Sequence, residues 1–278
     1  EGLDHNWVSC FGYRPATAEA ILQDWVRALP NLAWRPQCCL LEVERRGGRI
    51  TAVEVERSVA GARERERIGC TLVIDGSDRG DLLPLAQAPF RLGWEAQEQW
   101  GEASAPSRQR LESEPFFEQQ PVQSPTWVVM GQLAGDRLQP DPERGLDPAG
   151  VPTLPEPFER ACQAFGLERT ISYGRLPGGL VMLNWPLHGN DWHDGIARAF
   201  SGDTEAEAEL NSAMLAHSLR FADALEQASG GWLQRGAGFP AEAASPAPWL
   251  AAMPYWREGR RLIGHHTVVE QELLPQGP

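Results

Sequence analysis

The sequence predicts an α/β fold. Residues 71–74 are apolar and end in a turn of small and acidic residues, after which leucine and alanine recur at helical spacing. This order is typical of a buried strand of a parallel or mixed sheet that leads into a helix. Apolar residues also alternate on both sides of Gly47-Gly48, which predicts a β-hairpin. Two further stretches, beginning near Pro15 and Thr204, carry an apolar face at helical spacing.

The turn at residues 75–81 has the composition of a binding loop. Gly76 and Gly80 let the backbone bend sharply and let another group approach closely. Asp78 or Asp81 can cap the helix that follows. A strand, a small-residue turn and a helix N-terminus together suit a phosphate or the polar edge of a cofactor. An ordinary strand-to-helix turn has the same pattern, so the residues alone leave both interpretations open.

Length and charge limit the class of protein. The chain has 278 residues, of which 42% are hydrophobic and 23% charged, as in a globular protein with a sizeable core. Its net charge of −13 argues against a general nucleic-acid surface or an anionic membrane partner. The sequence has 25 arginines and no lysine, which excludes lysine nucleophiles within this chain. No apolar stretch approaches the roughly 20 residues of a membrane span.

Cysteine usage indicates the compartment. The 5 cysteines are scattered and form no C-x-x-C pair. This pattern favours buried thiols in a reducing environment, and we expect a cytoplasmic protein. The chain has no signal peptide and begins at Glu1 instead of methionine. We therefore expect it to be a fragment of a longer protein.

The middle of the chain changes in composition. The charged run at residues 63–67 is predicted to be a solvated hairpin tip. From about residue 92 to residue 166, proline, glutamine and glutamate become frequent, with a strand predicted within 123–133 and a short helix at 156–165. Proline at this density blocks both helices and sheet ladders. We interpret this region as a second domain inserted into the first.

A long helix is predicted after Thr204. Thr204 and Glu207 form a capping box, and Gly230-Gly231 ends the helical pattern. His217 lies on this helix, and we interpret it as a structural histidine.

Polar and aromatic side chains gather at residues 184–194, where a second predicted hairpin ends. Tryptophan walls with a few amide, carboxylate and imidazole groups suit an oriented polar substrate. The alternative is a metal site, and its candidate ligands are His188, Asp191, His193 and Asp194. Their spacing is not one of the strong ligand patterns, so no metal is predicted.

Arginines gather near the end of the chain. Arg257, Arg260 and Arg261 lie beside aromatic residues. A guanidinium group pairs with carboxylate or phosphate through two hydrogen bonds, so one of these arginines could face a substrate. Neutralisation by Glu258 at a domain seam is the alternative, and both remain open.

Three separate motifs resemble the family of FAD-dependent oxidoreductases. Residues 75–82 are similar to that family's Asp-Ala-Thr-(Gly/Glu)-x-Gly-Asp-Leu segment, and residues 89–106 continue much as the family does. Residues 184–191 resemble its Asn-Trp-Pro-x-His-Gly-Asn-Asp segment almost residue for residue. Residues 254–264 resemble its Pro-Tyr-x-Arg-Glu-x-Arg-Arg-x-x-Gly segment.

The resemblance implies a two-domain flavoprotein. Residues 1–91 and 246–278 would form part of a Rossmann-like FAD-binding domain, and residues 92–245 an inserted α+β substrate domain. The implied cofactor is FAD, and the implied partner is a small polar substrate that is oxidised or reduced. The cofactor-binding residues would be Asp75, Gly76, Ser77, Gly80 and Asp81. The substrate-binding residues would be His188, Asn190, Asp191, Arg257 and Arg260.

Two parts of the family pattern are missing from the chain. No G-x-G-x-x-G motif follows an N-terminal strand, and nothing after Pro278 supplies the family's last flavin-contacting segment. We therefore expect an internal fragment that is inactive alone and binds FAD weakly or not at all. An uncovered sheet edge would favour self-association.

Two other functions remain open. The 11 tryptophans and many carboxylates also suit a carbohydrate-active or sugar-binding protein. A non-catalytic domain that has lost its nucleotide-binding half is the second alternative.

Overall fold

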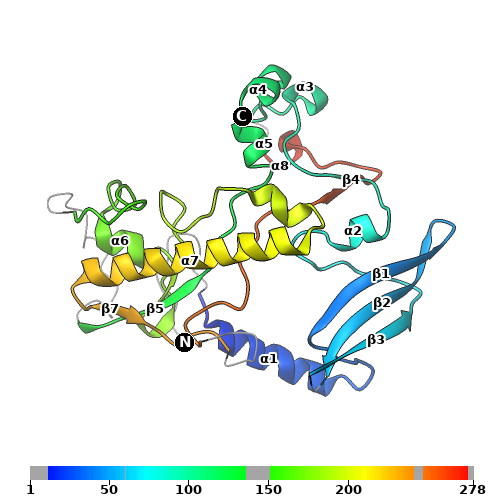
Figure 1. The fold of residues 1–278 in the computed structure, drawn as a ribbon, viewed down its shortest axis with the longest axis horizontal. Coiled ribbons are helices and arrows are strands. Elements are labelled where there is room, and N and C mark those ends of the chain that lie inside the picture. The colour runs from blue at the N-terminus through cyan, green and yellow to red at the C-terminus, as the bar shows by residue number, and fades with distance from the viewer. Residues whose placement is uncertain (1–11, 60, 136–150, 241–246, 275–278) are drawn as a thin grey trace. The chain divides into compact units, whose positions relative to one another are not determined.

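The computed structural model describes residues 12–59, 61–135, 151–240 and 247–274. Figure 1 shows a mixture of helices and small sheets, and every strand pair in the described part is antiparallel. No helix in that part of the chain is long and apolar enough to cross a membrane.

The chain forms two compact units, and each is discontinuous in sequence. Unit 1 consists of Glu1–Pro30 and Ser124–Tyr255, and unit 2 of Asn31–Gln123 and Trp256–Pro278. Residues 92–123, which the sequence suggested as the start of an insert, pack in the same unit as the acidic turn at residues 75–81.

Unit 1 is built on a three-stranded sheet. The central strand β5 (Val129–Leu133) pairs with β6 (Leu180–Leu183) on one side and β7 (Leu233–Arg235) on the other. The long helix α7 (Thr204–Ser229) packs against β5 and β7 (Figure 1). The strand expected within 123–133 is therefore present, and both of its neighbours come from later in the chain.

Short elements complete unit 1. They are α6 (Gly166–Ser172), η2 (Pro177–Gly179) and η3 (Ile196–Phe200). The prediction of a helix at 156–165 is wrong. This stretch forms successive turns that bury Phe158 and Cys162, and α6 begins directly after it. Pro157 cannot donate a backbone hydrogen bond, and burial of these apolar side chains sets the path instead.

Helix α7 has the predicted length and a different cap. Asp203 is the N-cap, and its carboxylate accepts hydrogen bonds from the backbone N–H groups of Glu205 and Ala206. The helix ends at Gly230, which is left-handed at φ 64°. The predicted cap, Thr204, is the first helical residue instead.

The core of unit 1 lies between α7 and the sheet. Its members are aliphatic and aromatic side chains that are almost fully buried. The largest of them include Phe158, Ile171, Trp185, Phe221, Leu225 and Leu233. Trp185 is anchored in this core, because its indole N–H donates to the carbonyl of Ala161.

Helix α1 (Pro15–Ala28) begins at Pro15 as predicted, and its apolar face is exposed. The backbone N–H of Ala16 donates to the carbonyl of Gly238, which ties the start of the helix to unit 1. Leu22 and Trp25 are 55% and 64% exposed, and no residue of α1 is buried.

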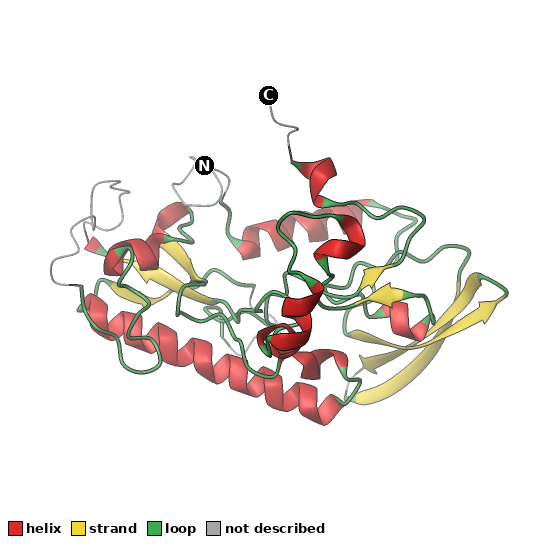
Figure 2. Cartoon of the chain, turned by 90° about the horizontal axis from the view of Figure 1, so that it is seen from above, coloured by secondary structure: helices red, strands yellow, loops and turns green. Residues whose placement is uncertain are grey.

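Unit 2 contains the predicted hairpin, extended by one strand. Strands β1 (Cys38–Arg46), β2 (Arg49–Val59) and β3 (Ala62–Gly69) form a twisted antiparallel sheet (Figure 2). The charged run at 63–67 lies inside β3 instead of at a hairpin tip. The alternating charges explain this, because Arg65 forms an ion pair with Glu54 of the neighbouring β2 and Arg67 forms one with Glu44 of β1.

The rest of unit 2 is made of short elements. Strand β4 (Phe90–Arg91) pairs with β8 (Arg261–Leu262), and the two come from the unit's two separate segments. The short helices are α2 (Leu82–Leu85), α3 (Gln97–Trp100), α4 (Arg108–Ser113), α5 (Phe116–Gln119) and α8 (Glu270–Leu273).

The strand predicted at residues 71–74 is not formed. The segment has no ladder partner among the described strands, and Leu72 and Ile74 are 76% and 84% exposed. A strand needs a neighbour to satisfy its backbone groups, and the sequence pattern alone does not provide that neighbour.

Candidate functional site

The acidic turn, residues 75–81, is organised by its own side chains. Both the backbone N–H and the hydroxyl of Ser77 donate to Oδ1 of Asp75, and the backbone N–H of Leu82 donates to Oδ2. The Ser77 hydroxyl in turn accepts from the backbone N–H of Asp81. Asp75, and not Asp78 or Asp81, therefore satisfies the start of α2.

The arginine segment, residues 256–261, supports the inner side of this turn. Gly80 is left-handed at φ 66°, and a Cβ atom there would lie 2.9 Å from the carbonyl oxygen of Arg260. A Cβ atom at Gly259 would lie 2.5 Å from the Cα atom of Arg79. Only glycine at both positions allows these two backbones to meet at this distance.

Arg260 fastens the contact. Its backbone N–H donates to the carbonyl of Arg79 at 3.1 Å, and its guanidinium group lies 3.2 Å from both that carbonyl and Oδ1 of Asp81. The Arg260 side chain is largely buried, and it also lies over the ring of Phe90. The structure thus brings together Arg260 and Asp81, one predicted substrate-binding residue and one predicted cofactor-binding residue.

The outer side of the acidic turn is open. Gly76 and Ser77 are exposed, and a Cβ atom at Gly76 would meet nothing within 4 Å. The backbone of this part of the turn can therefore be approached closely by a ligand. A supported turn with an exposed glycine and hydroxyl fits the polar edge of a nucleotide.

The histidine turn, residues 184–194, is held in unit 1 by buried polar groups. Asn190 is 1% exposed, and its Oδ1 atom accepts from the backbone N–H of Trp185 at 2.9 Å. Its amide group donates to the carbonyls of Leu183 and Trp127. The turn thus closes on the Asn190 side chain.

Asp191 is also buried. Its carboxylate accepts a hydrogen bond from the Thr126 hydroxyl, and the two residues form an isolated backbone bridge. His188, by contrast, is exposed and adopts a left-handed backbone conformation at φ 58°. Of the three predicted substrate-binding residues in this turn, His188 reaches the surface, while Asn190 and Asp191 shape the turn beneath it.

Two further histidines lie beside these residues. Nδ1 of His193 lies 2.7 Å from the hydroxyl oxygen of Ser124. His217 of α7 packs against the rings of Phe158 and Trp192, and its Nε2 atom lies 3.0 Å from the carbonyl oxygen of Gly189. Burial lowers the pKa of both imidazoles.

The other two arginines of this segment have different surroundings. Arg257 is half-buried within the arginine segment of unit 2, and Arg261 pairs with Glu95 and donates to the carbonyl of Gly93. No group of three or more histidine, cysteine or carboxylate side chains in the described ranges could hold a metal ion.

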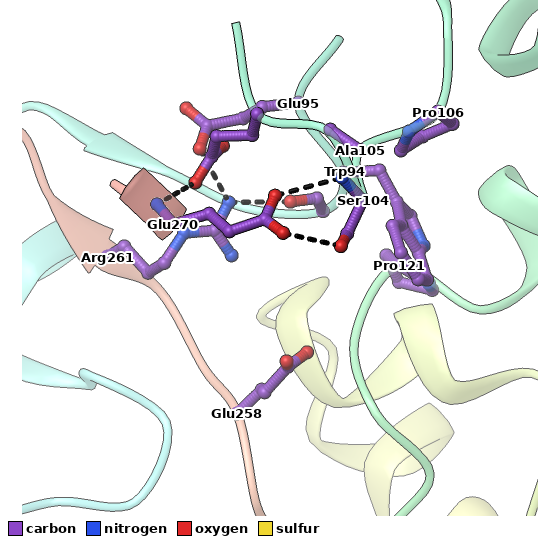
Figure 3. A pocket seen from close by; sticks show the side chains of 11 residues that line it. Trp94, Glu95, Ser104, Ala105, Pro106, Pro121, Glu258, Arg261 and Glu270 are labelled. Atoms are coloured by element: carbon purple, nitrogen blue, oxygen red, sulfur yellow. Dashed lines mark hydrogen bonds and ion pairs between the residues drawn. The ribbon is translucent and has the colours of Figure 1, made fainter. Parts of the chain in front are cut away.

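Unit 2 also contains an open pocket of about 430 Å³ (Figure 3). Trp94 and Pro121 line one side, and Glu270 and Arg261 lie opposite. Glu270 accepts hydrogen bonds from the backbone and hydroxyl of Ser104. Because its carboxylates bond to groups of the wall, the pocket has the chemistry of a structural contact between residues 93–106 and the segment that contains β8 and α8.

Sequence reasoning missed several residues of these sites. Gly259 lies within a recognised motif, and its need for glycine appears only in the contact with Arg79. Ser124 lies in an irregular segment 69 residues before His193, and no local spacing connects the two. Asp75 was expected to contact the cofactor, and its internal bonds to Ser77 follow a local Asx pattern that the sequence could have shown.

Comparisons with known proteins give one match. The family model described as FAD dependent oxidoreductase matches residues 2–278. No curated protein and no solved structure matches the chain significantly. Because the family match spans nearly every residue, the chain belongs to the family of FAD-dependent oxidoreductases, whose cofactor is FAD.

Proposed function

We propose that the protein oxidises or reduces a small polar substrate, with the flavin nucleotide held against the acidic turn. Membership of the family supports the general reaction class. The observation that carries the location is the construction of the turn: Gly259 and Arg260 support it from within, while Gly76 and Ser77 are left exposed.

The roles of the turn residues follow from their bonds. When bound, FAD supplies two-electron transfer, and the protein supplies binding and orientation. The backbone of Gly76 and the Ser77 side chain would contact the nucleotide. Asp75 orients Ser77, while Gly80 and Asp81 hold the turn against the arginine segment.

The substrate site is proposed at the histidine turn of unit 1. His188 is exposed there, and Asn190 and Asp191 fix the loop that presents it. Arg257 is a separate candidate within unit 2, because a guanidinium group pairs with carboxylate or phosphate. Arg260 contributes by positioning the arginine segment.

The test is FAD binding by the full-length protein and by two leucine variants. Gly76→Leu places a side chain over the exposed backbone, where nothing in the structure obstructs it. Gly48→Leu is the matched control, because Gly48 also has open space and lies in the β1–β2 turn. We expect Gly76→Leu to raise the Kd for FAD at least about tenfold, equivalent to about 1.4 kcal/mol. The control should leave it unchanged.

Flavin fluorescence quenching measures the Kd, and circular dichroism checks that both variants remain folded. Equal FAD affinity in the wild type and in Gly76→Leu would remove the acidic turn from the flavin site. Absence of FAD binding by the full-length wild-type protein, as distinct from the 278-residue chain expected to be a fragment, would contradict the proposed function itself.

A further inference from the structure

We propose that His193 takes up and returns the substrate proton in this reaction, and that Ser124 positions its imidazole ring. The inference rests on the proposed function, because it adds a proton-transfer residue to the proposed substrate site.

The geometry of His193 is that of a ring fixed on one side. Nδ1 lies 2.7 Å from the hydroxyl oxygen of Ser124, and Ser124 is only 7% exposed. Nε2 has no hydrogen-bond partner among the described residues, and His193 as a whole is exposed. One ring nitrogen is thus anchored in the protein while the other is available to a ligand.

The Ser124 hydroxyl can serve both protonation states of the ring. It can donate to Nδ1 of one neutral tautomer, and it can accept from the Nδ1–H group of the other tautomer or of the imidazolium. Because the hydroxyl rotates, the ring can gain a proton at Nε2 without leaving its position. A fixed ring that accommodates both states is what general acid–base catalysis requires.

The surroundings keep His193 ready to accept a proton. Partial desolvation by the surrounding protein lowers its pKa below the ordinary value of 6.5, Asp191 opposes this effect, and the charge of His188 adds to it. The imidazole is therefore neutral at pH 7. The carboxylate of Asp191 then favours the imidazolium once the proton has arrived.

The neighbouring histidines are less suited to this role. His217 uses Nε2 to bond Gly189, and its ring packs between Phe158 and Trp192. His188 has no anchoring hydrogen bond among the described residues. Of the three rings, His193 alone combines an anchored nitrogen with an open one.

A residue that accepts a proton from the substrate requires a substrate with an O–H or N–H group. The proposed substrate class is therefore an alcohol or an amine. Oxidation of such a substrate removes a proton from its O–H or N–H group, which Nε2 of His193 accepts, and a hydride from the adjacent carbon, for which bound FAD would be the acceptor. A C=O or C=N bond is left in the product. In the reverse direction Nε2 returns the proton.

The decisive variant is His193→Asn in the FAD-loaded full-length protein. An asparagine side chain reaches as far as Nδ1, so it can keep the bond to Ser124 while it removes Nε2. His265→Asn, at an exposed histidine of unit 2, is the matched control. Small alcohols, hydroxy acids and amines serve as reductants, and loss of the oxidised flavin absorbance is followed without oxygen in single turnovers.

We expect His193→Asn to slow flavin reduction about 100-fold or more. The variant should also lose the acid-side limb of the pH profile of this rate, while its affinity for FAD stays unchanged. Added imidazole should restore part of the rate. Ser124→Ala should shift that limb, because the ring loses its anchor. A rate within about threefold of the wild type for His193→Asn, with the same pH profile, would overturn the inference.

A second measurement does not depend on turnover. Diethyl pyrocarbonate modifies neutral imidazoles, and mass spectrometry of peptides reports each site. His193 should react faster than His217 at pH 7 and slow on acidification; equal or slower reaction would refute an available Nε2 atom. FAD binding without reduction by any of these donors would instead contradict the proposed substrate class.

Discussion

Gly259 lies against Arg79 so closely that a Cβ atom at position 259 would sit 2.5 Å from the Arg79 Cα atom. The backbone hydrogen bond between Arg260 and Arg79, 3.1 Å long, follows directly from this approach. Residues 181 positions apart in the sequence are thereby joined into one supported turn. The acidic turn therefore depends on glycine at position 259 as much as on the ion pair between Arg260 and Asp81.

Gly259→Ala should destabilise unit 2. The new methyl group would meet backbone atoms, which cannot move aside as a side chain can, so we expect a loss of about 1–3 kcal/mol in the free energy of unfolding. Gly264→Ala is the control, because its nearest contact would be an ordinary 3.4 Å. Urea denaturation of both variants measures the difference. Equal midpoints would mean that the two backbones do not meet as described.

The sequence predicted those elements whose cause is local. Helix α7 follows from its apolar face and from Gly230, and the β1–β2 hairpin follows from alternation around Gly47-Gly48. The segment at 71–74 fails for the opposite reason, because a strand depends on a neighbour that local pattern does not reveal. The run at 63–67 shows the same limit, since its pairing with β2 decides its structure.

The sequence likewise predicted only those features of the candidate site that have a local cause. The motifs identified the acidic turn and the histidine turn by residue type. The sequence does not reveal that Asn190 faces inward, because an asparagine in a turn can bond either to a ligand or to the backbone. The pairing of Ser124 with His193 needed the folded chain to bring distant segments together.

Asn190→Asp should destabilise unit 1 strongly. The substitution keeps the shape of the side chain but replaces two donated hydrogen bonds, to Leu183 and Trp127, with a carboxylate facing two carbonyls. Leaving buried carbonyls unsatisfied costs about 1–3 kcal/mol each, and the buried charge adds to that. Asn211→Asp, at a partly exposed position of α7, is the control for the change of charge. Thermal unfolding compares them, and similar melting temperatures would contradict the buried role of Asn190.

The cysteines should differ in reactivity. Cys162 is buried, burial raises the pKa of its thiol, and both effects suppress formation of the reactive thiolate. Cys39 is exposed on β1. We expect iodoacetamide to label Cys39 in the folded protein and to label Cys162 only after denaturation. Peptide mass spectrometry after timed labelling measures both, and rapid native labelling of Cys162 would show that the core of unit 1 opens readily.

His217 should make unit 1 less stable as the pH falls. Burial lowers its pKa in the folded state below 6.5, an effect that Arg220 and His193 reinforce and that Gly189 and Asp191 oppose. The unfolded chain therefore binds the proton at higher pH than the folded chain. Stability is full above about pH 6.5 and declines as the pH falls from there toward the folded-state pKa.

His217→Gln tests this directly, because a glutamine amide can still donate to the Gly189 carbonyl and does not titrate. The variant should lose some stability at pH 7, since the ring contacts with Phe158 and Trp192 disappear, yet its stability should fall less between pH 7 and pH 5. His193 also has a lowered pKa, so part of the pH dependence should remain. His265→Gln serves as the control at an exposed position. Urea unfolding at several pH values gives the slopes, and the same slope in His217→Gln as in the wild type would show that His217 is not the group that couples acidification to unfolding.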